Sequence, residues 1–296
     1  MQTWIIFSLL AALTWAIVNI SDKYVISKLI NRPMIPVLFM GILSIISAVV
    51  VYFVHGFEKM SWPLILMAGA AGVVYVAFAF CYFKAMQTEE VSRMVPLMYV
   101  NPLFILVISI FLFSEVLTVF KYLGVLLLVL GGILISTEDI HKFKLSKGAW
   151  IMLFGTFLLA VNQVLTKYLL NYADFWTVFA YVRIAAFIAL IPIFAIEFNH
   201  VMHIIKQKDK KAFWLITLTE TLNIVGILFI TVAIAGGSAT LANALSSVQP
   251  FIVLVFALLL SRFHPEIIKE SLHKKTIILK IAAIIIIVVG AGMVIK

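Results

Sequence analysis

Long runs of apolar residues, each about twenty residues in length, alternate with short polar or charged connections along almost the whole chain. A helix needs roughly 20 apolar residues to cross a membrane core about 30 Å thick. Strands of a membrane β-barrel would instead alternate apolar and polar positions over about ten residues. These runs are continuously apolar, so they predict transmembrane α-helices. The ten expected spans are 3–20, 33–54, 62–83, 91–113, 117–136, 147–170, 175–196, 212–235, 239–261 and 276–295.

The two halves of the chain resemble each other. Residues 97–104 read LMYVNPLF and residues 245–252 read LSSVQPFI, which places an amide and a proline at the same positions with an offset of 148. Residues 16–24 also match 160–168 with an offset of 144, which aligns Asn19 with Gln163 and the Lys-Tyr pair at 23–24 with that at 167–168. Because five is an odd number, two five-helix units in one chain enter the membrane from opposite sides. The predicted fold is an all-α integral membrane protein of ten transmembrane helices, in two inverted five-helix repeats at 1–140 and 141–296.

A proline near the centre of the fourth span and of the ninth span points to a polar region at the middle of the membrane. Pro102 and Pro250 each remove one backbone hydrogen bond from a helix, and the carbonyl that loses its partner must face protein or a water-filled cavity. A primary amide precedes each proline, Asn101 in one half and Gln249 in the other. This pattern favours a substrate cavity between the repeats. The alternative is a pair of kinks held by hydrogen bonds between helices.

Polar and aromatic residues on several other spans are candidates to line the same cavity. Taken singly, each is also explained by packing or by hydrogen bonding between helices. Tyr75, Gln163 and Ser247 are further polar residues of this kind. The predicted substrate-binding residues are Asn101, Gln249, Tyr99, Ser246, Asn243, Asn19, Trp15, Tyr82, Asn162 and Asn223.

Two ionisable residues lie inside predicted spans. Glu220 and Arg183 are each about eight residues from an end of their helices, which places each about 12 Å deep from opposite faces. The remaining difference in depth, about 10 Å, is too long for an ion pair unless the Arg183 side chain snorkels, so we do not assume that the two residues pair. A charged group at this depth is by default a functional candidate. Glu220 and Arg183 are therefore the predicted coupling residues, and Glu220 would bind a proton or a substrate amine. The alternative is a protonated, hydrogen-bonded Glu220, or a helix that starts later.

Composition excludes most other classes of protein. Hydrophobic residues make up 64% of the chain and charged residues 12%, against about 45–50% and about 25% in an ordinary soluble domain. A soluble enzyme, a disordered chain and a nucleic-acid-binding module are excluded, although the formal net charge is +9. No HExxH or GxSxG motif occurs, and the single cysteine, Cys81, fits packing within its span. We expect no catalytic site, no cofactor and no metal.

The ten spans with a proline in the fourth helix of each half resemble the drug/metabolite transporter superfamily, EamA type. The family's small and acidic residues after that helix match Ser114 and Glu115, and its arginine in the second helix of a repeat matches Arg183. The second half departs from the pattern, because Glu266 is displaced by three residues from the matching position. The resemblance implies a multi-pass plasma-membrane exporter of amino acids or other small metabolites, which works by alternating access. Its expected partners are a small-molecule metabolite, membrane lipid and protons as the candidate coupling ion, without nucleic acid.

Amides, hydroxyls and aromatic rings around a cavity suit a small polar or zwitterionic organic solute better than a bare ion. Two alternatives to a carrier remain at this point. One is a structural or regulatory membrane subunit, and the other is a channel.

The positive charges are unevenly distributed between the two faces of the membrane. The connections after spans one, three, five, seven and nine hold seventeen Lys and Arg residues, and the opposite face holds four. The positive-inside rule makes the face with seventeen cytoplasmic, which predicts that both termini lie outside. The family resemblance implies cytoplasmic termini, so the two indications disagree about orientation.

Overall fold

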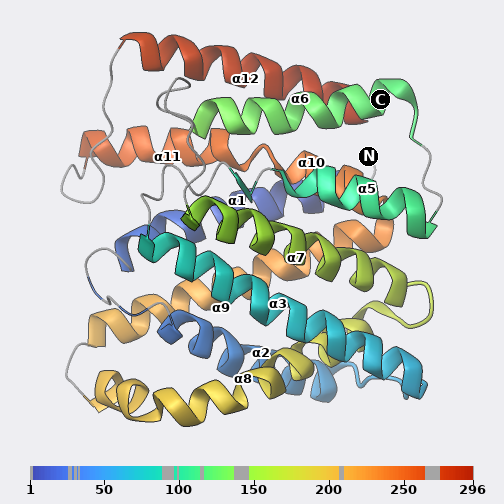
Figure 1. Ribbon diagram of the computed structural model, residues 1–296, viewed down its shortest axis with the longest axis vertical. Coiled ribbons are helices and arrows are strands. Elements are labelled where there is room, and N and C mark those ends of the chain that lie inside the picture. Colours follow the sequence, from blue (N-terminus) through green and yellow to red (C-terminus); the bar gives the residue numbers. More distant parts are fainter. Residues whose placement is uncertain are drawn as a thin grey trace.

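The computed structural model describes residues 3–25, 29, 32, 34–88, 97–98, 100–113, 117–136, 147–206, 210–263 and 274–295, and regular secondary structure within them is entirely helical. The helices run roughly side by side, and the start of the first and the end of the last lie at the same end of the bundle (Figure 1). They are α1 (Thr3–Tyr24), α2 (Met34–Val54), α3 (Trp62–Thr88), α5 (Asn101–Phe113), α6 (Val119–Ser136), α7 (Lys147–Leu169), α8 (Phe175–Lys206), α9 (Lys210–Gly236), α10 (Ala239–Ser246), α11 (Gln249–Phe263) and α12 (Lys274–Ile295).

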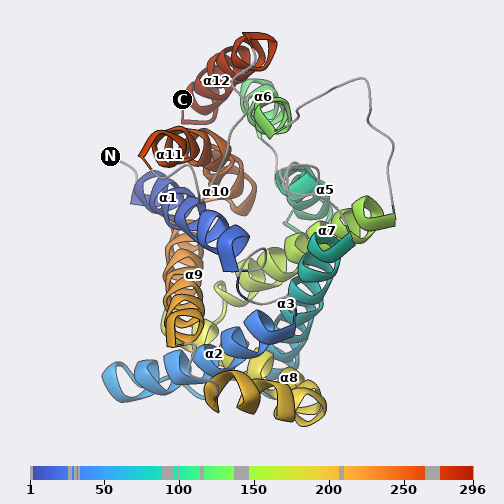
Figure 2. The same cartoon turned by 90° about the vertical axis from the view of Figure 1, so that its left-hand side faces the viewer.

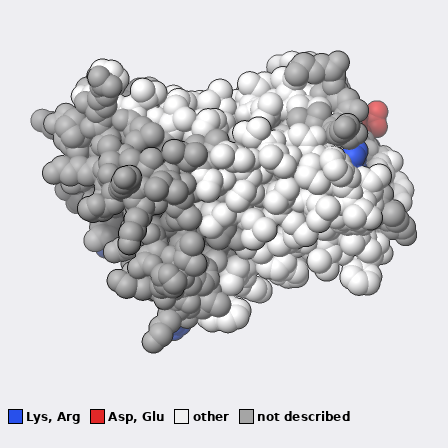
Figure 3. All heavy atoms as spheres, turned by 90° about the horizontal axis from the view of Figure 1, so that it is seen from above, with Lys and Arg blue, Asp and Glu red and all other residues white. Residues whose placement is uncertain are grey.

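Six of these helices, α1, α2, α3, α7, α8 and α9, are long and apolar enough to cross a membrane. The apolar helical segments described in α5, α6 and α12 are shorter. The middle of the face seen in Figure 3 shows no charged side chain among the atoms that are not grey, and the coloured atoms lie toward the ends. The all-helical membrane architecture is therefore confirmed. The count of ten full spans stays a prediction.

The expected continuous ninth span is wrong, because the chain breaks into α10 and α11 in front of Pro250. A new helix that begins at Gln249 places the proline in its first turn, where the missing N–H costs no hydrogen bond. The fourth span has the same break, since Val100 forms a turn and α5 starts with Asn101 and Pro102. Both breaks contain a backbone hydrogen bond that spans three residues instead of the four of an α-helix. Val100 donates to Leu97 at 3.4 Å, and Val248 donates to Leu245 at 3.2 Å, each through backbone atoms.

Several helix ends differ from the prediction. The first span was expected to end at residue 20 and the seventh at 196, but α1 continues to Tyr24 and α8 continues to Lys206. Polar residues after an apolar run were interpreted as connections, whereas the helical backbone continues through them. At the end of α2, Gly56 adopts a φ of 73°, and its N–H caps the last turn through the carbonyls of Val51 and Tyr52.

The helices enclose the centre of the molecule in pairs. Seen along their axes, α1 and α9 form one side, α3 and α7 the other, α2 and α8 one end, and α6 and α12 the opposite end (Figure 2). Two large hydrophobic clusters fill the interior, and Trp15 packs against both of them. Small residues allow the closest approaches. A Cβ on Gly72 of α3 would lie 2.6 Å from the backbone nitrogen of Ala186 in α8.

Candidate functional site

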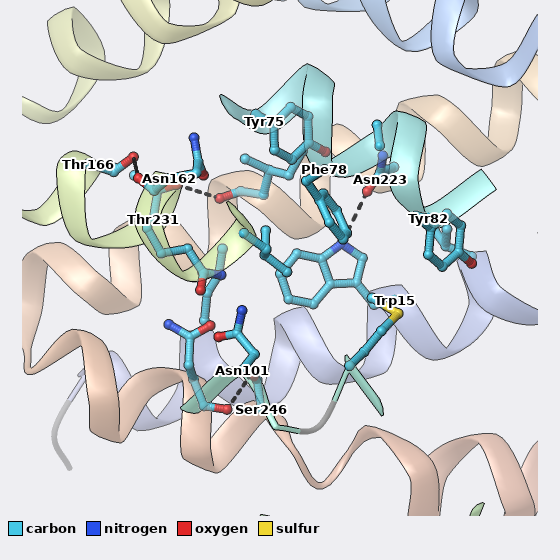
Figure 4. A pocket seen from close by; sticks show the side chains of 18 of the residues that line it. Trp15, Tyr75, Phe78, Tyr82, Asn101, Asn162, Thr166, Asn223, Thr231 and Ser246 are labelled. Carbon is cyan, nitrogen blue, oxygen red and sulfur yellow. Dashed lines mark hydrogen bonds between the residues drawn. The ribbon is translucent and has the colours of Figure 1, made fainter. Parts of the chain in front are cut away.

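A cavity of about 170 Å³ lies between the paired helices, and its walls come from α1, α2, α3, α5, α7, α8, α9, α10 and α11. Figure 4 shows polar side chains and aromatic rings from several of these helices around a common space. Of the twelve predicted site residues, Tyr99 lies outside the described residues. The other eleven all line this cavity: Trp15, Asn19, Tyr82, Asn101, Asn162, Arg183, Glu220, Asn223, Asn243, Ser246 and Gln249.

Two amide side chains in the wall have buried polar atoms with no hydrogen-bond partner in the part of the chain that the structure describes. Asn101, at the start of α5, is 5% exposed, and neither its oxygen nor its nitrogen has such a partner there. The Oε1 atom of Gln163 in α7 is also buried without one. A buried polar group without a partner costs about 1–3 kcal/mol. Atoms of this kind in a cavity wall are therefore suited to bind water or a polar solute.

Other predicted residues use their donors within the protein. The Nδ2 atom of Asn162 donates to the carbonyl of Ala71 at 2.9 Å, which joins α7 to α3. In α10, Asn243 Nδ2 donates to the carbonyl of Ala239 at 2.9 Å, and Ser246 Oγ donates to the carbonyl of Asn243 at 2.9 Å. These bonds fit the alternative role considered for single polar residues, in which they hold the helices in place. The three residues nevertheless line the cavity.

A chain of hydrogen bonds joins α1 and α9 across one wall. Trp15 Nε1 donates to Asn223 Oδ1 at 3.2 Å, and Asn223 Nδ2 donates to Glu220 Oε2 at 3.2 Å. The indole reaches α9 because Gly226 lies where it crosses, and a Cβ there would be 2.7 Å from Trp15 Nε1. Glu220 itself is only 3% exposed. Its carboxylate is thus held in a fixed position in the wall by a neutral amide.

Arg183 places a positive charge in the same cavity. It is 2% exposed, and its guanidinium carbon lies 4.7 Å from the ring centroid of Tyr75 and 5.7 Å from that of Phe179. Such cation–π contacts contribute about 0.5–2 kcal/mol each. No ion pair between Arg183 and Glu220 occurs among the described residues. The cavity wall therefore holds a basic and an acidic side chain that are not paired with each other.

Sequence reasoning missed Asp22, Thr166 and Thr231, which also line the cavity. Asp22 was overlooked because the first span was ended at residue 20. Its spacing would have identified it, since Trp15, Asn19 and Asp22 follow the i, i+4, i+7 pattern of one helix face. Thr166 lies one turn after Asn162 in the same way. Helical spacing from residues already chosen would therefore have predicted these cavity residues better than residue type did.

At one end of the cavity, a lysine joins two helices. In the last turn of α7, Lys167 Nζ donates to the carbonyl of Ile234 at 2.8 Å and to that of Gly237 at 2.7 Å. Carbonyls at a helix C-terminus have no partner within the helix and attract a positive charge. Lys167 thus joins the ends of α7 and α9, close to the cavity residues Thr166 and Ile234.

Comparisons with known proteins relate the first half of the chain to one family. Residues 2–137 match the EamA-like transporter family, which is part of the drug/metabolite transporter superfamily. None of the curated proteins compared with the sequence matches it. A solved structure described as "Crystal structure of protein" aligns with a TM-score of 0.69 at 18% sequence identity. The alignment covers 98% of this chain and 95% of that chain, so the fold as a whole is one already seen in a solved structure.

Proposed function

Since residues 2–137 of the chain belong to the EamA-like transporter family, we propose that the protein is a secondary transporter of small polar organic metabolites such as amino acids. It would act as an exporter in the plasma membrane and would bind its solute in the cavity between the helix pairs. The observation that carries this proposal is the convergence of eleven predicted polar and aromatic residues, from separate helices, on one cavity.

The pairing of the helices supports an alternating-access mechanism between two inverted repeats. Helix α1 packs on α9 in the way that α3 packs on α7, and α2 with α8 and α6 with α12 form the remaining pairs. If the two halves are related by a two-fold axis, each of these contacts has its counterpart in the other half. The matching breaks before Asn101 and Gln249 fit the discontinuous helices that form substrate sites in such transporters.

Proton coupling is assigned to Glu220 in this proposal. The carboxylate is buried, lines the cavity, and has a neutral amide, that of Asn223, as its hydrogen-bond partner. A buried carboxylate can exchange a proton when the cavity opens to one side of the membrane and then to the other. Asp22 interacts electrostatically with Glu220, so two carboxylates share the negative side of the cavity.

The transporter proposal is tested by uptake of radiolabelled amino acids into proteoliposomes that contain the purified protein. We expect saturable uptake, which Asn101→Ala and Gln249→Ala each reduce by about tenfold, because a buried hydrogen bond to the solute is lost. Asn171→Ala is the matched control, since Asn171 is exposed in the turn after α7 and does not line the cavity. A structural subunit would show no uptake with the wild-type protein, and a channel would show unsaturable flux and steady single-channel currents.

A further inference from the structure

Arg183 is a buried positive charge in the cavity wall without a counter-ion among the described residues. No ion pair involves it there, and its Nε and Nη1 atoms are buried without a hydrogen-bond partner. An arginine in a protein keeps its charge at all relevant pH values, so it cannot avoid the cost of burial by losing its proton. Burial of a charge is strongly unfavourable unless the charge is paired. The unpaired nitrogens therefore require a partner from outside the described protein.

The surroundings of Arg183 leave its edge available for such a partner. The guanidinium lies over the ring of Tyr75, which contacts it through the flat side, and Phe179 lies on its own helix at 5.7 Å. The hydroxyl of Tyr75 also interacts with the guanidinium. The Nε and Nη1 atoms still have no hydrogen-bond partner among the described residues. Aromatic faces stabilise the cation but do not accept its N–H groups in the plane.

The negative groups of the cavity lie elsewhere in its wall. Glu220 and Asp22 come from α9 and α1, and Tyr75 interacts electrostatically with both Arg183 and Glu220. Neither carboxyl group forms an ion pair with Arg183 among the described residues. A solute with an anionic group can therefore reach an arginine whose charge is not already paired.

We propose that Arg183 binds the carboxylate of the transported solute, and that this contact makes a free carboxylate a requirement for transport. The planar guanidinium matches the planar carboxylate, and hydrogen bonds between two charged groups are stronger than those between neutral ones. This assignment rests on the proposed transport function. It adds the chemical group that the solute must carry and the residue that selects for it.

The test compares each of the twenty L-amino acids with its α-carboxamide, as competitors and as substrates, in proteoliposomes. The carboxamide keeps the size and the amine but replaces the negative carboxylate by a neutral amide. We expect the wild-type protein to prefer the acid by about tenfold to a hundredfold, as the loss of a charged hydrogen bond predicts. Arg183→Gln should bring the ratio to about one, and Arg183→Lys should retain part of the preference.

Arg32→Gln is the matched control for the loss of an arginine. Arg32 is exposed, lies 3.9 Å from Glu197 and does not line the cavity, so this variant should keep the wild-type ratio. An equal preference for acid and amide in the wild-type protein, or an unchanged ratio in Arg183→Gln, overturns the role of Arg183 and leaves the transporter proposal standing. Absence of uptake of every probe by the wild-type protein overturns the transporter proposal for amino acids. If Arg183→Gln does not fold, the acid-to-amide ratios of the wild-type protein and of Arg183→Lys test the role of Arg183, and equal ratios in these two proteins overturn it.

Discussion

Glu220 is a residue whose chemistry can be changed with little change of shape. Its Oε2 atom accepts a hydrogen bond from Asn223, and a glutamine at this position can still accept that bond while it carries no charge and releases no proton. We expect Glu220→Gln to abolish the stimulation of uptake by a pH gradient. Exchange of labelled for unlabelled solute at equal pH should continue, because it needs no net proton movement.

Proteoliposome uptake with and without a pH gradient measures this effect. Glu197→Gln is the control, since Glu197 pairs with the exposed Arg32 and lies outside the cavity. If gradient-driven uptake persists in Glu220→Gln, the proton passes through another group, and Asp22 becomes the next candidate.

Asp174 illustrates a different role for a carboxylate, at the start of α8 and outside the membrane-spanning segments. Its Oδ1 atom accepts hydrogen bonds from the backbone N–H groups of Trp176 at 2.8 Å and Thr177 at 3.2 Å. Partial burial alone would raise the pKa of Asp174, but the hydrogen bonds from Thr177 and Trp176 and the nearby His55 lower it below its ordinary value.

We expect Asp174→Ala to destabilise the protein by about 1 kcal/mol at neutral pH, as the loss of a helix N-cap does. Because the pKa is lower in the folded state, the contribution is complete above the unfolded value of about 3.9 and is lost as the pH falls through the folded value. Thermal unfolding in detergent should therefore show a lower Tm for the variant at pH 7 and a smaller difference near pH 3. Asp174→Asn, which can still cap the helix, should lose less stability, and an equal Tm for all three proteins at pH 7 would count against the cap.

At the scale of elements, the sequence predicted which segments are helical but not how they end or break. The prolines at 102 and 250 were expected to kink continuous helices, whereas each lies in the first turn of a new helix. Proline disrupts a helix interior and is tolerated in a first turn, so the same residue is compatible with both outcomes. The amides next to the prolines were found because of the repeat between the halves. Asp22 was missed because an apolar-run criterion ends a helix at its first charged residues.

Helices α6 and α12 pack closely. Two glycines of α12, one in this contact and one outside it, allow the effect of packing to be measured apart from that of helix propensity. A Cβ on Gly290 would lie 2.9 Å from the carbonyl oxygen of Gly124 and 2.9 Å from the backbone nitrogen of Leu128, both in α6. A Cβ on Gly292 would have no atom within 4 Å outside its own helix. We expect Gly290→Ala to lower stability by about 1–3 kcal/mol through overpacking, and Gly292→Ala to leave it unchanged or slightly higher. A comparison of Tm in detergent tests this, and equal values for the two variants would mean that the helices are not in close contact.

At the scale of the whole molecule, the arrangement of helices gives the protein two distinct ends. The start of α1 and the end of α12 lie at the same end, which agrees with an even number of crossings (Figure 1). Residues of the cavity wall come from both halves, so the site could not have been assembled from either half of the sequence alone. The relative positions of Arg183, Tyr75 and Glu220 depend on how α3, α8 and α9 pack, which no sequence pattern specifies.

The charge count predicts the orientation of these ends, and single cysteines can test that prediction. Seventeen of the Lys and Arg residues belong to the face that includes Lys147, and four belong to the face of Lys59 and the termini. Both residues are exposed, Lys59 in the connection between α2 and α3 and Lys147 at the start of α7. A background without Cys81, the single cysteine, is obtained with Cys81→Ala, which keeps the Cβ that packs near Gly155.

In intact cells, a membrane-impermeant maleimide should label Lys59→Cys and should reach Lys147→Cys only after the cells are permeabilised, because basic connections stay in the cytoplasm. The reverse pattern would place the termini inside, as the family resemblance implies. In that case the end of the cavity where Lys167 joins α7 to α9 would face the cytoplasm instead of the exterior, since the end of α7 and the connection before α3 lie at the same end of the bundle (Figure 1). The orientation thus decides on which side of the membrane Lys167 joins α7 to α9.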